Sequence, residues 1–176
     1  MKILLRYIAM LSMAALLSAC IYVDQPVGKR LPIPQEMAGN WKVDMKMGKR
    51  GKSRQMQVRI EDETLVLRWD DDDKEGKAQL YEHAGQRYLA LINDGRSGGY
   101  MILHVAAANA ASMKLEMMDA KRVEALLKEM QLPAESRDRS LFRELKVSQA
   151  GLEALLTRHA GVAFDKTETI DLTRLD

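Results

Sequence analysis

The sequence predicts a mainly β (α+β) protein: an antiparallel meander or small β-barrel with two short C-terminal amphipathic helices. Over most of residues 39–118, apolar residues alternate with polar ones, which is the pattern of half-buried strands. Turn signals divide this region into short stretches. From residue 119 the apolar spacing changes to that of helices. A stretch of this length suits one domain.

The alternating region contains about seven expected strands. The first has Trp41, Val43 and Met45 on one face, and the next two continue in the same way. The turns between strands are rich in acidic residues or glycine, namely residues 61–63, 70–76, 83–86, 93–95 and 98–99. Short links between consecutive strands are typical of an antiparallel meander, and seven or eight such strands can close into a small barrel.

Two helices are expected after the meander. Asp119 can cap the first, whose apolar residues Val123, Leu126, Leu127 and Met130 share one face, and Leu132-Pro133 ends it. Ser148 can cap the second, and Gly161 fits its C-terminal cap. The second helix places Leu152, Leu155, Leu156 and His159 on one face. A strand over 141–147 precedes the second helix, and a last strand over 169–175 follows it with Ile170, Leu172 and Arg174 on one face.

The chain begins with a secretory pattern. Lys2 and Arg6 precede an apolar stretch from Ile8 to Leu17, which is too short to span a bilayer comfortably. Leu17-Ser18-Ala19-Cys20 resembles the lipobox of bacterial lipoproteins. The resemblance implies that residues 1–19 are a signal peptide and that Cys20, the only cysteine, carries diacylglycerol and a further acyl chain such as palmitate. The alternatives are an ordinary signal peptide with a chance cysteine, or a single membrane-spanning helix.

The lipoprotein resemblance also predicts an address. Aspartate after the lipidated cysteine is the usual inner-membrane retention signal in proteobacteria, and here the residue is Ile21. We therefore expect anchoring to the outer membrane, most simply facing the periplasm. Lys2 and Arg6 leave with the signal, so the mature chain has 25 basic and 25 acidic residues. A neutral domain has no basic excess for nucleic acid.

Residues 20–38 are expected to form the lipidated cysteine and a proline-rich tether, before a single β-rich domain over 39–176. Pro26, Pro32 and Pro34 lie in this segment. Proline-rich chain extends at about 3.1 Å per residue, so the tether could hold the domain up to about 50 Å from the bilayer. The alternative is that part of the segment packs as an edge strand.

Gly39-Asn40-Trp41, at the start of the first expected strand, is similar to the G-x-W motif of lipocalins and related calycin barrels. This resemblance implies that Trp41 packs across the floor of a barrel. The family's T-D-Y segment and its late arginine on the last strand are not identified in the sequence.

Four groups of residues suggest metal or phosphate chemistry, and each has a simpler interpretation. The acidic run Asp70 to Asp73 has Lys74 where a calcium ligand should be, which favours a solvated turn. Methionines could bind Cu(I), but their alternation indicates a core or an apolar ligand-lining surface. His83, His104 and His159 have no metal-ligand spacing, and the glycine-rich segment 95–99 joins two strands rather than opening a helix. The candidate copper methionines are Met45, Met47, Met113, Met117 and Met118.

No nucleophile elbow, thiol nucleophile, P-loop or dinucleotide fingerprint is present, so an enzyme is not expected. No cofactor, catalytic residue or metal site is predicted. The leading hypothesis is a lipid-anchored, non-catalytic envelope lipoprotein that binds a small apolar ligand or lipid. The alternatives are an envelope interaction or assembly lipoprotein with a protein partner, and a methionine-rich periplasmic copper binder.

Overall fold

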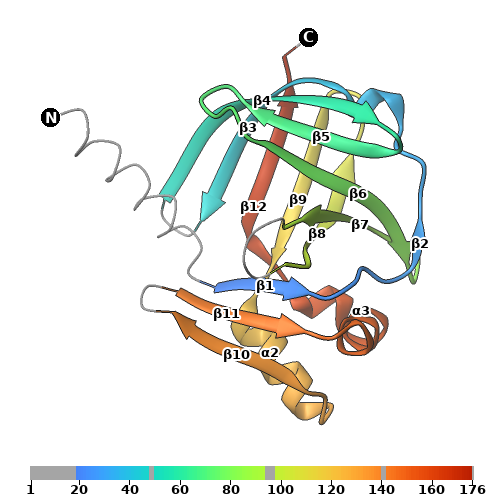
Figure 1. Cartoon of the computed structure of the whole chain (residues 1–176), viewed down its shortest axis with the longest axis vertical. Helices are drawn as coiled ribbons and strands as arrows, with labels where there is room; N and C mark the ends of the chain where they lie inside the picture. Colours follow the sequence, from blue (N-terminus) through green and yellow to red (C-terminus); the bar gives the residue numbers. More distant parts are fainter. Residues whose placement is uncertain (1–18, 48–49, 94–97, 140–141, 176) are drawn as a thin grey trace, which may run out of the picture.

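The structure, a computed structural model, describes residues 19–47, 50–93, 98–139 and 142–175. Eight antiparallel strands form a closed barrel (Figure 1). Seven of them run as a meander, and β12 inserts between β9 and β3, while β8 pairs with β9 to close the ring. The barrel strands are β3 (Gly39–Met47), β4 (Arg50–Glu61), β5 (Thr64–Trp69), β6 (Glu75–His83), β7 (Gln86–Ile92), β8 (Tyr100–Ala108), β9 (Ser112–Met118) and β12 (Phe164–Arg174). The predicted fold class and the seven-strand meander are confirmed.

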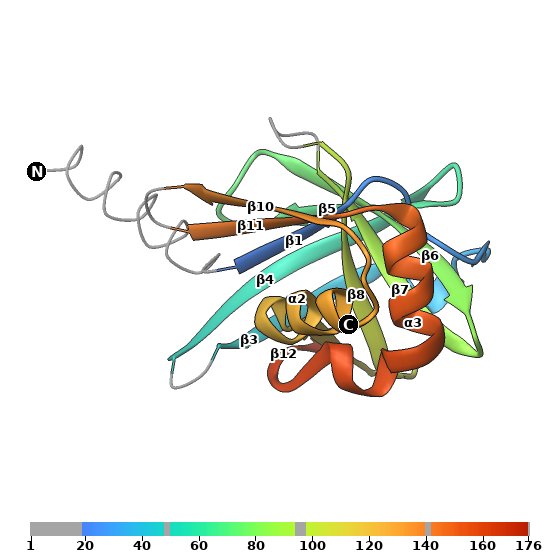
Figure 2. The same cartoon turned by 90° about the horizontal axis from the view of Figure 1, so that it is seen from below.

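The chain between β9 and β12 forms a layer outside the barrel. It consists of helix α2 (Ala120–Glu129), strands β10 (Ala134–Arg139) and β11 (Phe142–Val147), and helix α3 (Gln149–Ala163). Figures 1 and 2 show these elements together at one end of the molecule, beside β1. Strand β10 was not expected from the sequence. The expected strand over 141–147 corresponds to β11, with residue 141 outside the described residues.

The predicted helix starts are confirmed. The Asp119 side chain accepts hydrogen bonds from the backbone N–H groups of Lys121 and Arg122, and the Ser148 hydroxyl accepts one from Gly151. The predicted cap at Gly161 is wrong, because α3 kinks at His159 (φ −134°, ψ 20°) and continues to Ala163 before β12 begins. The last strand is therefore five residues longer at its start than expected, beginning at Phe164 rather than Thr169.

The expected extended tether is also wrong for the part of residues 20–38 that the structure describes. Strand β1 (Ala19–Val23) pairs in parallel with β11 and touches β8 at Tyr100. Strand β2 (Lys29–Arg30) pairs with β6, and the 3₁₀ helix η1 (Gln35–Met37) precedes β3. The physical reason is apolar burial, since five side chains of this segment lie in the core: Ile21, Val23, Val27, Ile33 and Met37.

Glycine is required where this segment crosses β6. Gly28 has φ +90°, and a Cβ at this position would lie 2.1 Å from the carbonyl oxygen of Glu82. Only a residue without a side chain allows the two backbones to approach so closely. The segment between the cysteine and the barrel is thus fitted to the barrel wall.

Two apolar clusters follow from the alternation of side chains in the barrel strands. We call the residues inside the barrel the inner cluster; it includes Trp41, Met56, Leu89, Leu103 and Leu115. We call the residues between the outside of β7–β9 and the added layer the outer cluster. Its members include Val23, Tyr88, Ile102, Leu127, Val147, Leu155 and Phe164.

Candidate functional site

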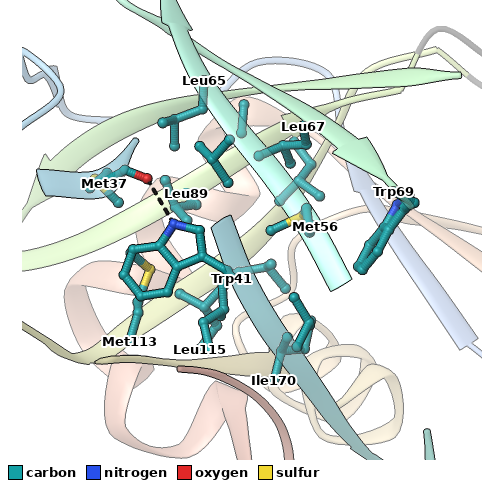
Figure 3. A pocket seen from close by; sticks show the side chains of 16 residues that line it. Met37, Trp41, Met56, Leu65, Leu67, Trp69, Leu89, Met113, Leu115 and Ile170 are labelled. Atoms are coloured by element: carbon teal, nitrogen blue, oxygen red, sulfur yellow. Dashed lines mark hydrogen bonds between the residues drawn. The ribbon is translucent and has the colours of Figure 1, made fainter. Parts of the chain in front are cut away.

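The interior of the barrel contains an apolar cavity of about 80 Å³. Sixteen side chains line it, and none of them carries a charge. They come from η1 and from all eight barrel strands, and include Met37, Trp41, Met56, Trp69, Met113 and Ile170 (Figure 3). Since period-2 alternation places every second residue of a strand on the inside, the predicted apolar faces of the strands are the faces that form this cavity.

At one end of the barrel, Trp41 contacts both η1 and β12. The Trp41 indole Nε1–H donates to the carbonyl oxygen of Met37 in η1, at 3.2 Å (Figure 3). Arg174, near the end of β12, lies over the Trp41 ring at 5.5 Å and donates to the carbonyls of Glu36 (2.7 Å) and Ala38 (2.9 Å). The last strand therefore places Arg174 against the Trp41 ring, although the arginine that lipocalins have on their last strand was not identified from the sequence. Alternation had placed Arg174 on the same face as Ile170 and Leu172, but it did not indicate the contact with Trp41.

At the other end of the cavity, one cation lies against its wall. Arg54 lies on β4 two residues before Met56, and its guanidinium lies 4.5 Å from the ring centroid of Trp69. It forms an ion pair with Asp71, a member of the acidic run. Sequence reasoning missed Arg54, even though its spacing from Met56 and Val58 places it on the inward face.

The methionines of the barrel strands belong mainly to the inner cluster. Met113 is buried, and Met45 and Met117 pack against the same cluster, as the alternation predicted. The side chain of Met47 lies outside the described residues. Met118 belongs to the outer cluster, so Met117 and Met118 lie on opposite faces of β9. A flexible thioether wall can change its shape around an apolar guest.

The three histidines are widely separated. The His83 Nε2 lies 2.9 Å from the Thr157 hydroxyl, and His159 lies at the kink of α3. The His104 Nδ1 lies 2.9 Å from Glu116 Oε2, and its Nε2 lies 3.0 Å from Gln86 Oε1. The carboxylate partner of His104 was not visible in the sequence, because Glu116 faces it across the β8–β9 pairing.

The acidic run is a charged turn in which three carboxylates, those of Asp71, Asp72 and Asp73, have protein partners. Asp73 faces Arg68 at 3.5 Å, and the Asp72 carboxylate accepts from the backbone N–H of Lys74 at 3.0 Å. Within the part of the chain that the structure describes, no group of three or more His, Cys, Asp or Glu residues is arranged to hold a metal ion. The glycine-rich segment lies mostly outside the described residues, with only Gly98 and Gly99 placed.

Comparisons with protein-family models, curated proteins and solved structures gave no match to this chain. The fold and the cavity therefore define the class by themselves: a closed eight-stranded antiparallel barrel with an apolar interior and an added helical layer. Among the residues the structure describes, no helix is long and apolar enough to cross a membrane.

Proposed function

We propose that this protein is a lipid-anchored, non-catalytic binding module of the bacterial envelope that takes a small apolar ligand or a lipid chain inside its barrel. The observation that carries the proposal is the uncharged cavity enclosed by the eight strands. Buried empty space lowers stability, so it is retained more readily where a ligand fills it.

The size of the cavity restricts the ligand. Pockets for drug-sized molecules measure about 300–1,000 Å³, and an apolar cavity of about 150 Å³ takes one benzene ring. A cavity of about 80 Å³ therefore suits a narrow group, such as part of a single acyl chain. Rearrangement of Met37, Met56 and Met113 could lengthen the space along the barrel.

The first experiment is native mass spectrometry of the mature chain, residues 20–176 with Cys20→Ser, exported to a bacterial periplasm behind a signal peptide that is cleaved without a lipobox cysteine. The substitution removes the proposed acyl anchor, so any bound lipid is a ligand. A reproducible adduct of lipid mass that disappears on organic extraction is the expected result. A bare mass would contradict ligand binding, and a mass increase of one copper ion would favour the methionine alternative instead.

The anchor has its own test. Cells grown with labelled palmitate should label the native chain, and Cys20→Ser should lose the label and leave the membrane fraction. Because the backbone of Cys20 already belongs to β1, acyl chains on this residue would hold the domain close to the bilayer rather than at the end of a long tether. Labelling that survives Cys20→Ser would refute the proposed anchor.

The second candidate function is binding of an envelope protein partner. The observation that favours it is the order of the sheet, in which β10 pairs with β11 on one side and ends the path through the described strands. An open strand edge can accept a strand from a partner. Crosslinking in intact cells from position 135 or 136 of β10 would test this function, and crosslinks from the outward-facing position 68 of β5 provide the control.

A further inference from the structure

Arg54 occupies an unusual position for a cation. Met56 and Val58, the next two residues on its face of β4, line the cavity, and the residue opposite Arg54 on β3 is Val43, which also lines it. The Arg54 side chain is only 10% exposed. A charged side chain in such an apolar position is costly unless its hydrogen-bonding groups are satisfied.

Not all hydrogen-bond donors of the Arg54 guanidinium have a partner among the described residues. Its Nη2 pairs with Asp71, and its plane lies against Trp69. Its Nε is buried and has no hydrogen-bond partner among the described residues. Buried donors without a partner are rare, and a ligand is one group that can supply the missing acceptor.

Asp71, the ion-pair partner of Arg54, can break this ion pair and turn to solvent. The Asp71 side chain is 56% exposed and stands in the charged turn after β5, where solvent can hydrate it. Nε and the adjacent Nη of a guanidinium form one edge with two parallel N–H donors, which matches the two oxygens of a carboxylate. An incoming carboxylate could take this edge while Asp71 turns to solvent.

Building on the proposed function, we propose that the ligand is a single-chain amphiphile with a carboxylate head. Part of the chain occupies the cavity, and the head binds the Nε/Nη2 edge of Arg54. Trp69 connects the two parts of the site, because it lines the cavity and also covers the guanidinium.

Decanoate and its neutral analogue decanol test the proposal by titration into the mature chain, residues 20–176 with Cys20→Ser. The chain has two tryptophans, Trp41 and Trp69, and both line the cavity, so intrinsic fluorescence reports binding directly. We expect decanoate to bind about tenfold more tightly than decanol, because the carboxylate forms a bidentate ion pair with the guanidinium, whereas the hydroxyl oxygen of decanol accepts a single hydrogen bond and carries no charge.

Two substitutions of Arg54 and one matched control complete the design. Arg54→Met should remove the preference for decanoate and leave decanol affinity within about twofold, which also shows that the barrel is folded. Arg54→Lys keeps the positive charge but lacks the two parallel N–H donors of arginine, so it should retain only part of the preference for decanoate over decanol. Arg68→Met removes a half-exposed arginine that pairs with Asp73, and it should bind both compounds like the parent.

The outcomes separate this inference from the proposed function. If neither compound binds, the proposed function fails. If both bind equally and Arg54→Met changes nothing, apolar binding stands and the role of Arg54 is refuted. Tighter binding of decyl phosphate than of decanoate would overturn the carboxylate assignment.

Discussion

The two apolar clusters of this protein differ in how completely they are filled. The inner cluster surrounds a cavity of about 80 Å³ and is rich in methionine and tryptophan. A space of about 10 Å³ lies at the outer cluster, which includes aliphatic side chains that are 0% exposed, such as Val123, Leu127 and Leu155. Close packing is the usual state of a protein interior, so the loosely filled region is the one that requires a functional explanation.

The difference suggests a division of roles. Helices α2 and α3, together with β1 and β11, cover the outside of β7–β9 and bury apolar surface there. A wall that is stabilised from outside can keep its interior open. Stability should therefore depend more on the outer cluster, and ligand binding on the inner one.

Loss of a leucine from each cluster should show the largest difference. Leu155→Ala removes a side chain that is 0% exposed in α3 and should lower the free energy of unfolding by about 3–5 kcal/mol. Leu67→Ala, at a half-buried position that lines the cavity, should cost about 1–2 kcal/mol. Urea denaturation measures both, and equal costs would contradict the division of roles.

Loss of the Arg174 contacts around Trp41 should have the next largest effect on stability. Arg174→Met removes the hydrogen bonds to the Glu36 and Ala38 carbonyls and the contact with Trp41, at an expected cost of about 2–3 kcal/mol. Arg174→Lys should recover part of this loss, and the exposed Arg68→Met serves as control. Emission measured with Trp69→Phe in both chains, so that Trp41 alone reports, should change in Arg174→Met, and an unchanged spectrum would show that the arginine does not contact the Trp41 ring.

A matched pair of alanines sharpens the comparison further. Ala78 lines the cavity from β6, and Ala90 lies on the outer face of the neighbouring strand β7. Ala90→Leu should lose about 1–3 kcal/mol by overpacking. Ala78→Leu can extend into empty space, so its stability should stay within about 1 kcal/mol of the parent while its lipid adduct in native mass spectrometry disappears.

The sequence predicted features that depend on neighbours along the chain. The seven strands follow from alternation, and the caps at Asp119 and Ser148 follow from local hydrogen bonding. The pairing of β1 with β11 was not predictable, because it joins segments separated by more than a hundred residues, and the prolines between them favoured an extended tether. Burial of Ile21 and Val23 outweighs that local preference.

In the candidate site, too, the sequence predicted features that depend on neighbours along the chain but not contacts between strands. Alternation predicted the apolar wall, and applied one step further along β4 it would have placed Arg54 inside. The interpretation of Asp71 as one more residue of a solvated turn concealed its pairing with Arg54, which depends on how β4 and β5 align. Arg174 on Trp41 and Glu116 beside His104 are likewise contacts between strands.

The smallest predicted effect concerns Tyr88 in the outer cluster. Its hydroxyl is buried without a hydrogen-bond partner among the described residues, and its ring stacks on Phe164 at 5.7 Å. Tyr88→Phe removes only the unpaired hydroxyl, so it should raise stability by about 1 kcal/mol at neutral pH. Tyr100→Phe, at a half-buried position on β8, is the control for loss of a tyrosine hydroxyl.

Alkaline pH should enlarge the difference between the parent and Tyr88→Phe. Burial raises the pKa of Tyr88 from 10.0 to about 12. The folded state thus holds its proton more tightly than the unfolded state, so the stability contributed by neutral Tyr88 is complete below pH 10 and is lost as pH rises through about 12. Urea midpoints measured from pH 8 upward should fall more steeply for the parent than for Tyr88→Phe. Parallel curves would mean that solvent reaches this hydroxyl and that the outer cluster is less tightly closed than its packing indicates.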